Sequence, residues 1–195
     1  ISRDERDLKA LKSDLEIKFK TSVKYFVLDA ASFDETKKFL DSNQNLLDEI
    51  EGVLFPIGMM QPKDEILNDI VISNNLFQAN FGSIAYFLSK IFKIFLKKNK
   101  GVIVGFGSVT TTFGRNKNIL YAASKRALDS LFESLSISSI HTNIKIQYYT
   151  IGYMESSLSY GEKLFLPKGS PKKLKNKVIK NLNKNYNKKY FPSWW

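Results

Sequence analysis

Short apolar runs alternate along the chain with longer segments whose apolar residues recur every three or four positions. The short runs have the length and the β-branched or aromatic composition of strands, and lie at residues 23–28, 52–57, 102–107 and 144–149. Helical periodicity marks the longer segments, at residues 4–15, 33–49, 64–96 and 122–135. The third is long enough for two helices, divided or kinked around Asn74 and Asn75. Strands that alternate with helices predict βαβ units and a parallel sheet, and therefore an α/β fold.

The composition is that of one globular domain. The chain has 195 residues, of which 43% are hydrophobic and 25% charged, and this length is enough to bury a sizeable core. The sequence has no cysteine, which excludes disulfides and cysteine-ligated zinc. His141 is its single histidine, which excludes a site built from several histidines. We therefore expect no metal centre.

The net charge of +11 belongs to the end of the chain. Residues 163–195 hold ten lysines and no acidic residue, so residues 1–162 carry only the remaining +1. We therefore divide the chain into a core, residues 1–162, and a basic, aromatic segment, residues 163–195, which packs on the core or extends from it. The basic segment is either attracted to an anionic surface or substrate, or is simply a solvated surface rich in lysine and asparagine. Nucleic acid is not expected, because no recognised binding module accompanies the charge.

The sequence shows neither a membrane span nor a signal peptide. A spanning helix needs about 18 uninterrupted apolar residues, and the nearest stretch, residues 84–96, is broken by Ser89, Lys90 and Lys93. The chain starts with Ile1 and has no signal-peptide pattern. We expect a cytoplasmic location, with peripheral membrane contact through the C-terminal segment as an open alternative.

Three residues with complementary chemistry follow the third predicted strand. Ser108 comes directly after that strand, where open α/β sheets bind ligands. Tyr121 opens the next predicted helix, and Lys125 lies one turn further on the same face. A nearby cation favours phenolate, so we expect Lys125 to pull the pKa of Tyr121 down from its reference value of about 10. Such a phenol can exchange a proton with an alkoxide. The alternative is a surface tyrosine and lysine that share a helix by chance.

Ser108 followed by the Tyr-x-x-x-Lys pattern of Tyr121 and Lys125 resembles the short-chain dehydrogenase/reductase family, a group of nicotinamide-dependent oxidoreductases. The resemblance implies a Rossmann-like, doubly wound parallel sheet with helices on both faces. It implies reversible hydride transfer between the nicotinamide and a ketone or secondary alcohol. Tyr121 is then the acid and base, Lys125 also bonds the nicotinamide ribose, and Ser108 orients the substrate oxygen.

Residues 78–82 and 150–156 match two further segments of this family. The first is similar to the segment in which Asn80 disturbs a helix and helps to hold a water that links Lys125 to solvent; otherwise Asn80 lies in an ordinary helix or at its cap. The second resembles the Pro-Gly-x-x-x-Thr loop that contacts the nicotinamide end, with Gly152 retained and Ser156 in place of Thr. Ile151 replaces the usual Pro, which removes a stiffer turn. By itself, Gly152 is just a turn residue.

The match is incomplete near the expected cofactor site. Of the family's Asn-Asn-Ala-Gly segment only Gly58 remains, in the run Phe55-Pro56-Ile57-Gly58. Asp29, at the end of the first predicted strand, matches the acidic residue that meets the adenine ring, although a turn-forming Asp explains it equally well.

The family's first strand, first helix and Gly-rich phosphate loop, Thr-Gly-x-x-x-Gly-x-Gly, do not occur in these residues. The chain begins at what looks like the end of the family's second strand, which we interpret as a truncated or incompletely represented polypeptide. At that position Ser2 and Arg3 suit a 2′-phosphate, because a guanidinium grips phosphate well. The pair therefore favours NADP over NAD, unless Arg3 is simply a surface residue.

The family sets its substrate in the segment after Gly152, here residues 153–171, which is apolar and aromatic. This segment either covers a bulky or lipid-like substrate or packs on the core. The ending, residues 188–195, is similar to that of members acting on lipid or polyprenyl-linked sugar substrates. The resemblance also implies a homodimer or homotetramer, formed through the helices around Asn80 and Tyr121. Two other classes are considered: a catalytically silent structural or interaction protein with the same fold, and a module that binds an anionic surface or nucleic acid through the lysine-rich tail without needing Tyr121.

Overall fold

The computed structural model describes residues 1–60, 69–114, 117–156, 166–185 and 188–195. Within them four parallel strands form a sheet in chain order: β1 (Gly52–Phe55), β2 (Gly101–Ser108), β3 (Ile144–Ile151) and β4 (Lys189–Phe191). Ser108 lies beside Ile151, which in turn lies beside Phe191. The carboxyl ends of β2, β3 and β4 therefore meet at one edge of the sheet, and the predicted parallel α/β architecture is confirmed.

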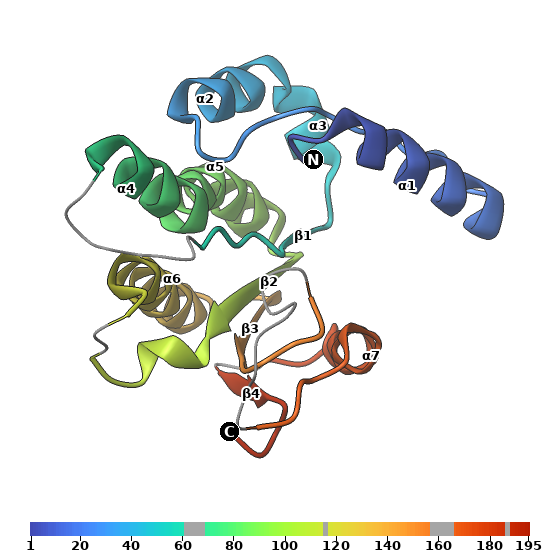
Figure 1. The fold of residues 1–195 in the computed structure, drawn as a ribbon. Coiled ribbons are helices and arrows are strands. Elements are labelled where there is room, and N and C mark those ends of the chain that lie inside the picture. Colours follow the sequence, from blue (N-terminus) through green and yellow to red (C-terminus); the bar gives the residue numbers. More distant parts are fainter. Residues whose placement is uncertain (61–68, 115–116, 157–165, 186–187) are drawn as a thin grey trace.

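The helices alternate with these strands, as Figure 1 shows. Three of them precede β1: α1 (Glu5–Phe19), α2 (Phe33–Ser42) and α3 (Gln44–Glu49). Between β1 and β2 lie α4 (Ile70–Phe77), a π-helical turn (Gln78–Gly82) and α5 (Ser83–Lys98). A short 3-10 turn (Val109–Thr111) and α6 (Ile119–Ser138) connect β2 to β3, and α7 (Pro171–Asn181) leads into β4. Side-chain caps begin several of these helices, for example Ser32 accepting from the Glu35 amide at 3.2 Å.

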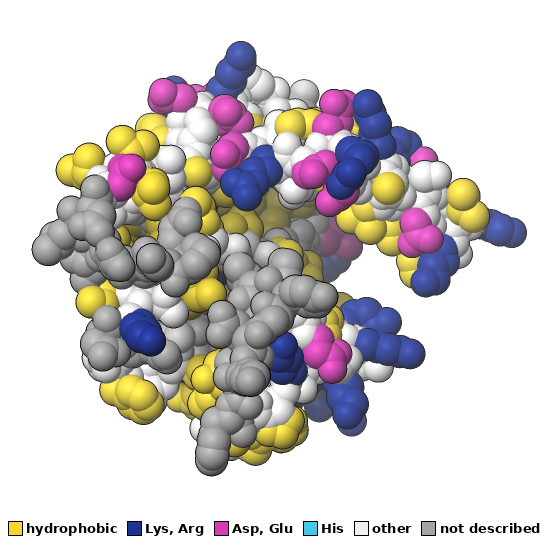
Figure 2. All heavy atoms as spheres, viewed as in Figure 1, with side chains coloured by type: hydrophobic (Ala, Val, Ile, Leu, Met, Phe, Trp, Pro, Cys, Tyr) yellow, Lys and Arg dark blue, Asp and Glu magenta, His cyan; other side chains and the backbone are white. Residues whose placement is uncertain are grey.

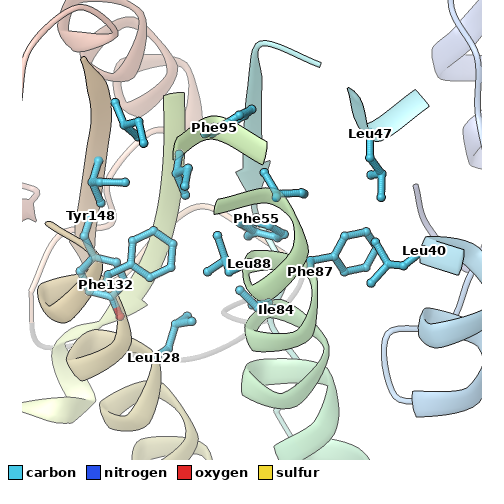
Figure 3. Packing of buried hydrophobic residues seen from close by; sticks show 14 residues of the cluster. Leu40, Leu47, Phe55, Ile84, Phe87, Leu88, Phe95, Leu128, Phe132 and Tyr148 are labelled. Carbon is cyan, nitrogen blue, oxygen red and sulfur yellow. The ribbon is translucent and has the colours of Figure 1, made fainter. Parts of the chain in front are cut away.

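One core lies between the sheet and helices α2, α3, α5 and α6. Figure 3 shows its side chains converging from these elements. Phe132 of α6 packs on β2 at Gly105, where an added Cβ would lie 2.4 Å from the ring. The buried stripe of α5 recurs at helical spacing and comprises Ile84, Phe87, Leu88, Ile91 and Phe95. Burial in the core therefore explains the apolar residues of this helix. They give no support for a contact between subunits.

Helix α7 covers the opposite face of β3, so the sheet has helices on both sides (Figure 1). Val178 of α7 packs against Tyr149 and Val104 of the sheet. Buried polar groups join the same elements: Tyr149 donates to Gln147 Oε1 at 2.7 Å, and Gln147 donates to the carbonyl oxygen of Asn181. Residues of the basic segment thus contribute both a strand and a packed helix.

Three predicted elements differ from the observed ones. The segment 23–28 is not a strand of the sheet, and makes a single parallel bridge from Val27 to Ser2. The predicted helix 33–49 is two helices, because the chain breaks at Asn43, whose side-chain amide caps the Phe39 carbonyl at 2.8 Å. The irregularity in the following helical segment falls at the π-helical turn, not around Asn74 and Asn75, while residues 61–68 lie outside the described part.

Candidate active site

Ser108 ends β2 with its hydroxyl at the carboxyl edge of the sheet. Its Oγ accepts hydrogen bonds from the backbone N–H of Thr110, at 3.2 Å, and from the Thr110 hydroxyl, at 3.0 Å. Its side chain is also hydrogen-bonded to that of Tyr121. Because Thr110 donates to the Ser108 oxygen, the Ser108 proton is left to be donated toward Tyr121 or a ligand oxygen. Ser108 is thus fixed in position by its own turn.

Tyr121 lies in the first turn of α6 and is hydrogen-bonded to Ser108. Burial raises the pKa of its phenol, and the Ser108 hydrogen bond opposes that rise. The expected downward pull from Lys125 is wrong for this structure, because loss of water is the dominant influence on the phenol. A phenol with a raised pKa is protonated at neutral pH, which is the state that donates a proton to a carbonyl oxygen.

Lys125 is buried one turn along α6 from Tyr121. Its side chain is only 2% exposed, and Nζ donates to the carbonyl oxygens of Ile57, at 2.8 Å, and Phe106, at 3.3 Å. Burial lowers the pKa of this amine to about 8. One carbonyl oxygen belongs to the loop that follows β1 and the other to the last part of β2, so Lys125 ties α6 to the carboxyl edge of the sheet.

Asn80 lies in the π-helical turn and is completely buried. Its Oδ1 accepts from the Met59 amide at 2.7 Å, and its Nδ2 donates to the Met59 carbonyl at 2.8 Å. The expected disturbance of the helix is confirmed, and an ordinary helical position is excluded. Gly58 lies between Ile57, held by Lys125, and Met59, held by Asn80. The five residues Gly58, Asn80, Ser108, Tyr121 and Lys125 therefore belong to one connected site; the water proposed beside Asn80 stays a prediction.

Arg3 and Asp29 form a separate pair of positions. Ser2 and Val27 form an isolated parallel β-bridge. Because the two segments run in the same direction, Arg3 and Asp29 both follow the bridge on its C-terminal side. Arg3 is exposed. The Asp29 carboxylate accepts from the Ala31 amide at 2.9 Å, which is the turn-forming interaction considered above as an alternative to adenine contact.

Gly152 and Ser156 follow β3. The Gly152 amide donates to the Phe191 carbonyl at 2.7 Å, and the indole of Trp195 packs on the glycine. Ser156 is exposed and borders residues 157–165, so much of the predicted substrate segment lies outside the described residues.

Three residues of this region were not singled out by the sequence. Thr110 orients Ser108, and its place two residues after a strand-ending serine is a usable local signal. Met59 and Trp195 have no such signal, because their partners Asn80 and Gly152 are distant in sequence.

A parallel sheet covered by helices on both faces, with a buried serine and lysine and a half-buried tyrosine at its carboxyl edge, defines a Rossmann-like oxidoreductase domain. The family described as short chain dehydrogenase matches residues 1–163. The chain belongs to this family, whose members are oxidoreductases acting on CH–OH groups.

Individual relatives are distant. The 3-oxoacyl-[acyl-carrier-protein] reductase FabG of Buchnera aphidicola subsp. Schizaphis graminum is 26% identical over 167 residues, covering 82% of this chain and 68% of that protein. FabG of Escherichia coli is 28% identical over 101 residues, covering 52% of this chain and 39% of that protein. The chain thus matches well under half the length of the second relative.

Solved structures share the fold. A bulky-bulky ketone specific alcohol dehydrogenase from Comamonas testosteroni has a TM-score of 0.84 at 17% identity, covering 97% of this chain and 74% of that one. A short-chain dehydrogenase from Sphingobium yanoikuyae in complex with NADPH has a TM-score of 0.84 at 18% identity, with coverages of 97% and 76%.

Proposed function

We propose that the protein is an NADP-dependent oxidoreductase that reversibly reduces a ketone to a secondary alcohol. The hydrogen-bonded pair of Ser108 and Tyr121, backed by the buried Lys125, carries the proposal. It supplies one group to orient a carbonyl oxygen and a second to protonate it.

The donor set fits a nicotinamide nucleotide and a carbonyl substrate bound side by side. Ser108, Tyr121 and Lys125 all present donors near the carboxyl ends of β1 and β2, and the buried hydroxyl of Thr150 on β3 has no hydrogen-bond partner among the described residues. Lys125 and Tyr121 are the groups to hold the nicotinamide ribose, and the segment from Gly152 to Ser156 the nicotinamide end. When bound, the nicotinamide supplies the hydride.

The protein's own residues supply the proton and the geometry. In the reducing direction Ser108 donates to the carbonyl oxygen and holds it beside Tyr121. The Tyr121 proton passes to that oxygen as negative charge develops on it. Lys125, with a pKa of about 8, is mostly protonated at neutral pH and is the proposed source of the proton that restores Tyr121. In the oxidising direction the same groups act in reverse.

NADP is favoured over NAD by Arg3. Its guanidinium is exposed and directly follows the bridge between Ser2 and Val27. It can therefore approach a 2′-phosphate and form charge-assisted hydrogen bonds with it. The Sphingobium yanoikuyae neighbour, whose structure contains NADPH, has the same fold.

The substrate is proposed to be a bulky or lipid-like ketone or alcohol. The relatives and neighbours include reductases of 3-oxoacyl groups and a dehydrogenase for bulky-bulky ketones. The segment after Gly152 retains apolar and aromatic residues, among them Tyr153 and Met154.

Peripheral contact with an anionic membrane is proposed through α7. Figure 2 shows Lys side chains gathered over this helix, and its exposed residues include Lys172, Lys173, Lys175 and Lys180 together with Ile179. No helix among the described residues is long and apolar enough to cross a bilayer. Co-sedimentation with phosphatidylserine vesicles tests the contact, and recovery in the supernatant favours a merely solvated surface. A cytoplasmic location and a homodimer or homotetramer stay predictions.

The alternative is a catalytically silent member of the family, favoured by the altered segment at residues 55–58 and by Ile151 in place of Pro. The test is NADPH oxidation by the complete protein with a panel of ketones, with the alcohol identified as product. Stoichiometric alcohol formation supports the oxidoreductase. Absence of both cofactor binding and turnover supports the silent protein.

A further inference from the structure

The indole of Trp195 lies directly on the backbone of Gly152, the residue that follows β3. A Cβ atom placed on Gly152 would lie 1.9 Å from Nε1 of Trp195, so a glycine is needed for this approach. The ring of Tyr153 meets the same indole edge to face, with 5.3 Å between the ring centroids. Trp195 thus contacts two successive residues of the segment that leaves β3.

Backbone hydrogen bonds hold this segment from two sides. On one side the Gly152 amide donates to the Phe191 carbonyl at 2.7 Å. On the other, the Gly169 amide donates to the Tyr153 carbonyl at 2.6 Å, and the Glu155 amide donates to the Gly169 carbonyl at 3.0 Å. The start of the segment therefore has a fixed course, and the Trp195 indole packs over the point where it begins.

The aromatic pair lies at the edge of the sheet that carries the reacting groups. Ser108 on β2 is the direct neighbour of Ile151 on β3, and neighbouring strands are about 4.8 Å apart. Gly152 is the next residue, so the backbone on which Trp195 packs begins one residue beyond the strand neighbour of Ser108. Trp195 is 36% exposed, which leaves part of the ring open to a ligand.

We propose that Trp195 is a positioning and specificity-determining residue of the carbonyl site. With Tyr153 it forms an aromatic wall, against which a flat ring attached to the carbonyl carbon packs. The contact between Trp195 and Gly152 fixes the position of this wall. Aromatic rings interact favourably in offset or edge-to-face geometry, and such contacts add to the gain from burying apolar surface. The substrate class is therefore a ketone with an aromatic or comparably flat ring. This inference rests on the proposed oxidoreductase function.

The kinetic test compares acetophenone with 2-butanone in the complete protein. Trp195→Ala is expected to raise KM for acetophenone about tenfold, with KM for 2-butanone and both kcat values within about twofold of wild type. Trp195→Phe should recover most of the loss. Trp194→Ala is the matched control, because the neighbouring tryptophan is 57% exposed, and it should leave both ketones within about twofold. Equal effects on the two ketones, or an equal effect of Trp194→Ala, overturn the inference.

A second measurement does not depend on turnover. Saturation-transfer NMR with acetophenone should show contact between its ring protons and the wild-type protein, lost in Trp195→Ala and kept in Trp194→Ala. If the wild type reduces no ketone while this pattern holds, the proposed function fails and the aromatic wall stands. If the wild type reduces ketones while Trp195→Ala changes neither the ratio of the KM values for the two ketones nor the NMR contact, the role of Trp195 is contradicted and the oxidoreductase function is retained.

Discussion

The ammonium of Lys125 donates to the carbonyl oxygen of Ile57 at 2.8 Å, which joins α6 to the loop that follows β1. Asn80 pairs with both main-chain groups of Met59, two residues further along the same loop. Gly58 is held between these attachments. The loop is therefore fastened by two side chains that belong to different helical segments, and its position depends on both.

Burial of Lys125 predicts a stability that depends on pH. Its pKa is about 8 in the folded protein and about 10.5 when unfolded, so the unfolded chain binds more protons between these values. Stability should therefore increase as the pH is raised from 8 to 10.5, by at most about 3 kcal/mol. The measurement is chemical denaturation of wild type and Lys125→Met over this range. Parallel stability curves for the two proteins would contradict the buried, titrating amine.

Asn80→Ala should loosen the loop after β1. The change leaves the amide and carbonyl of half-buried Met59 without their partners, which is expected to cost about 1–3 kcal/mol in total. Urea unfolding measures the loss, and hydrogen exchange should increase at the Met59 amide. Asn74→Ala, at an exposed position on α4, is the control and should change stability by less than about 0.5 kcal/mol.

Ser108→Ala removes the donor that holds the substrate oxygen. Loss of one such donor is expected to lower kcat by about 10²- to 10³-fold with little change in cofactor affinity. Steady-state NADPH oxidation with a ketone measures the change, with Ser134→Ala on the exposed side of α6 as control. A kcat within a few-fold of wild type would remove Ser108 from the reaction.

Arg3→Glu tests the choice of cofactor. Replacing a guanidinium that bonds the 2′-phosphate with a carboxylate should weaken NADPH binding about 10- to 100-fold and leave NADH binding unchanged or improved. Titration calorimetry with both cofactors, with Arg6→Glu on the exposed face of α1 as control, decides the point. An equal loss of affinity for NADPH and NADH would show that Arg3 does not bind the 2′-phosphate.

Strands β1, β2 and β3 and the main site residues could be predicted because their signals are local, whereas the three-residue strand β4 was not predicted. Buried parallel strands read as continuous apolar runs, and Tyr121 and Lys125 share a helix face by spacing alone. The run at residues 23–28 has the same composition but pairs only through Ser2, since pairing depends on the neighbours that a segment finds.

What could not be predicted depends on distant contacts. The π-helical turn accompanies the pairing of Asn80 with Met59, which lies 21 residues earlier. The direction of the Tyr121 pKa shift follows from burial, which helix spacing does not reveal. The packing of Trp195 on Gly152 joins residues that only the folded chain brings together.

The most direct test of the proposed chemistry is the single-turnover rate of ketone reduction by Tyr121→Phe, measured with saturating NADPH. The rate should fall by about 10²- to 10⁴-fold, because the proton donor is lost while the ring that fills the site remains. NADPH affinity should stay within a few-fold of wild type, and Tyr86→Phe should react at the wild-type rate. A Tyr121→Phe protein that reduces the ketone as fast as wild type would contradict the assignment of Tyr121 as the proton donor.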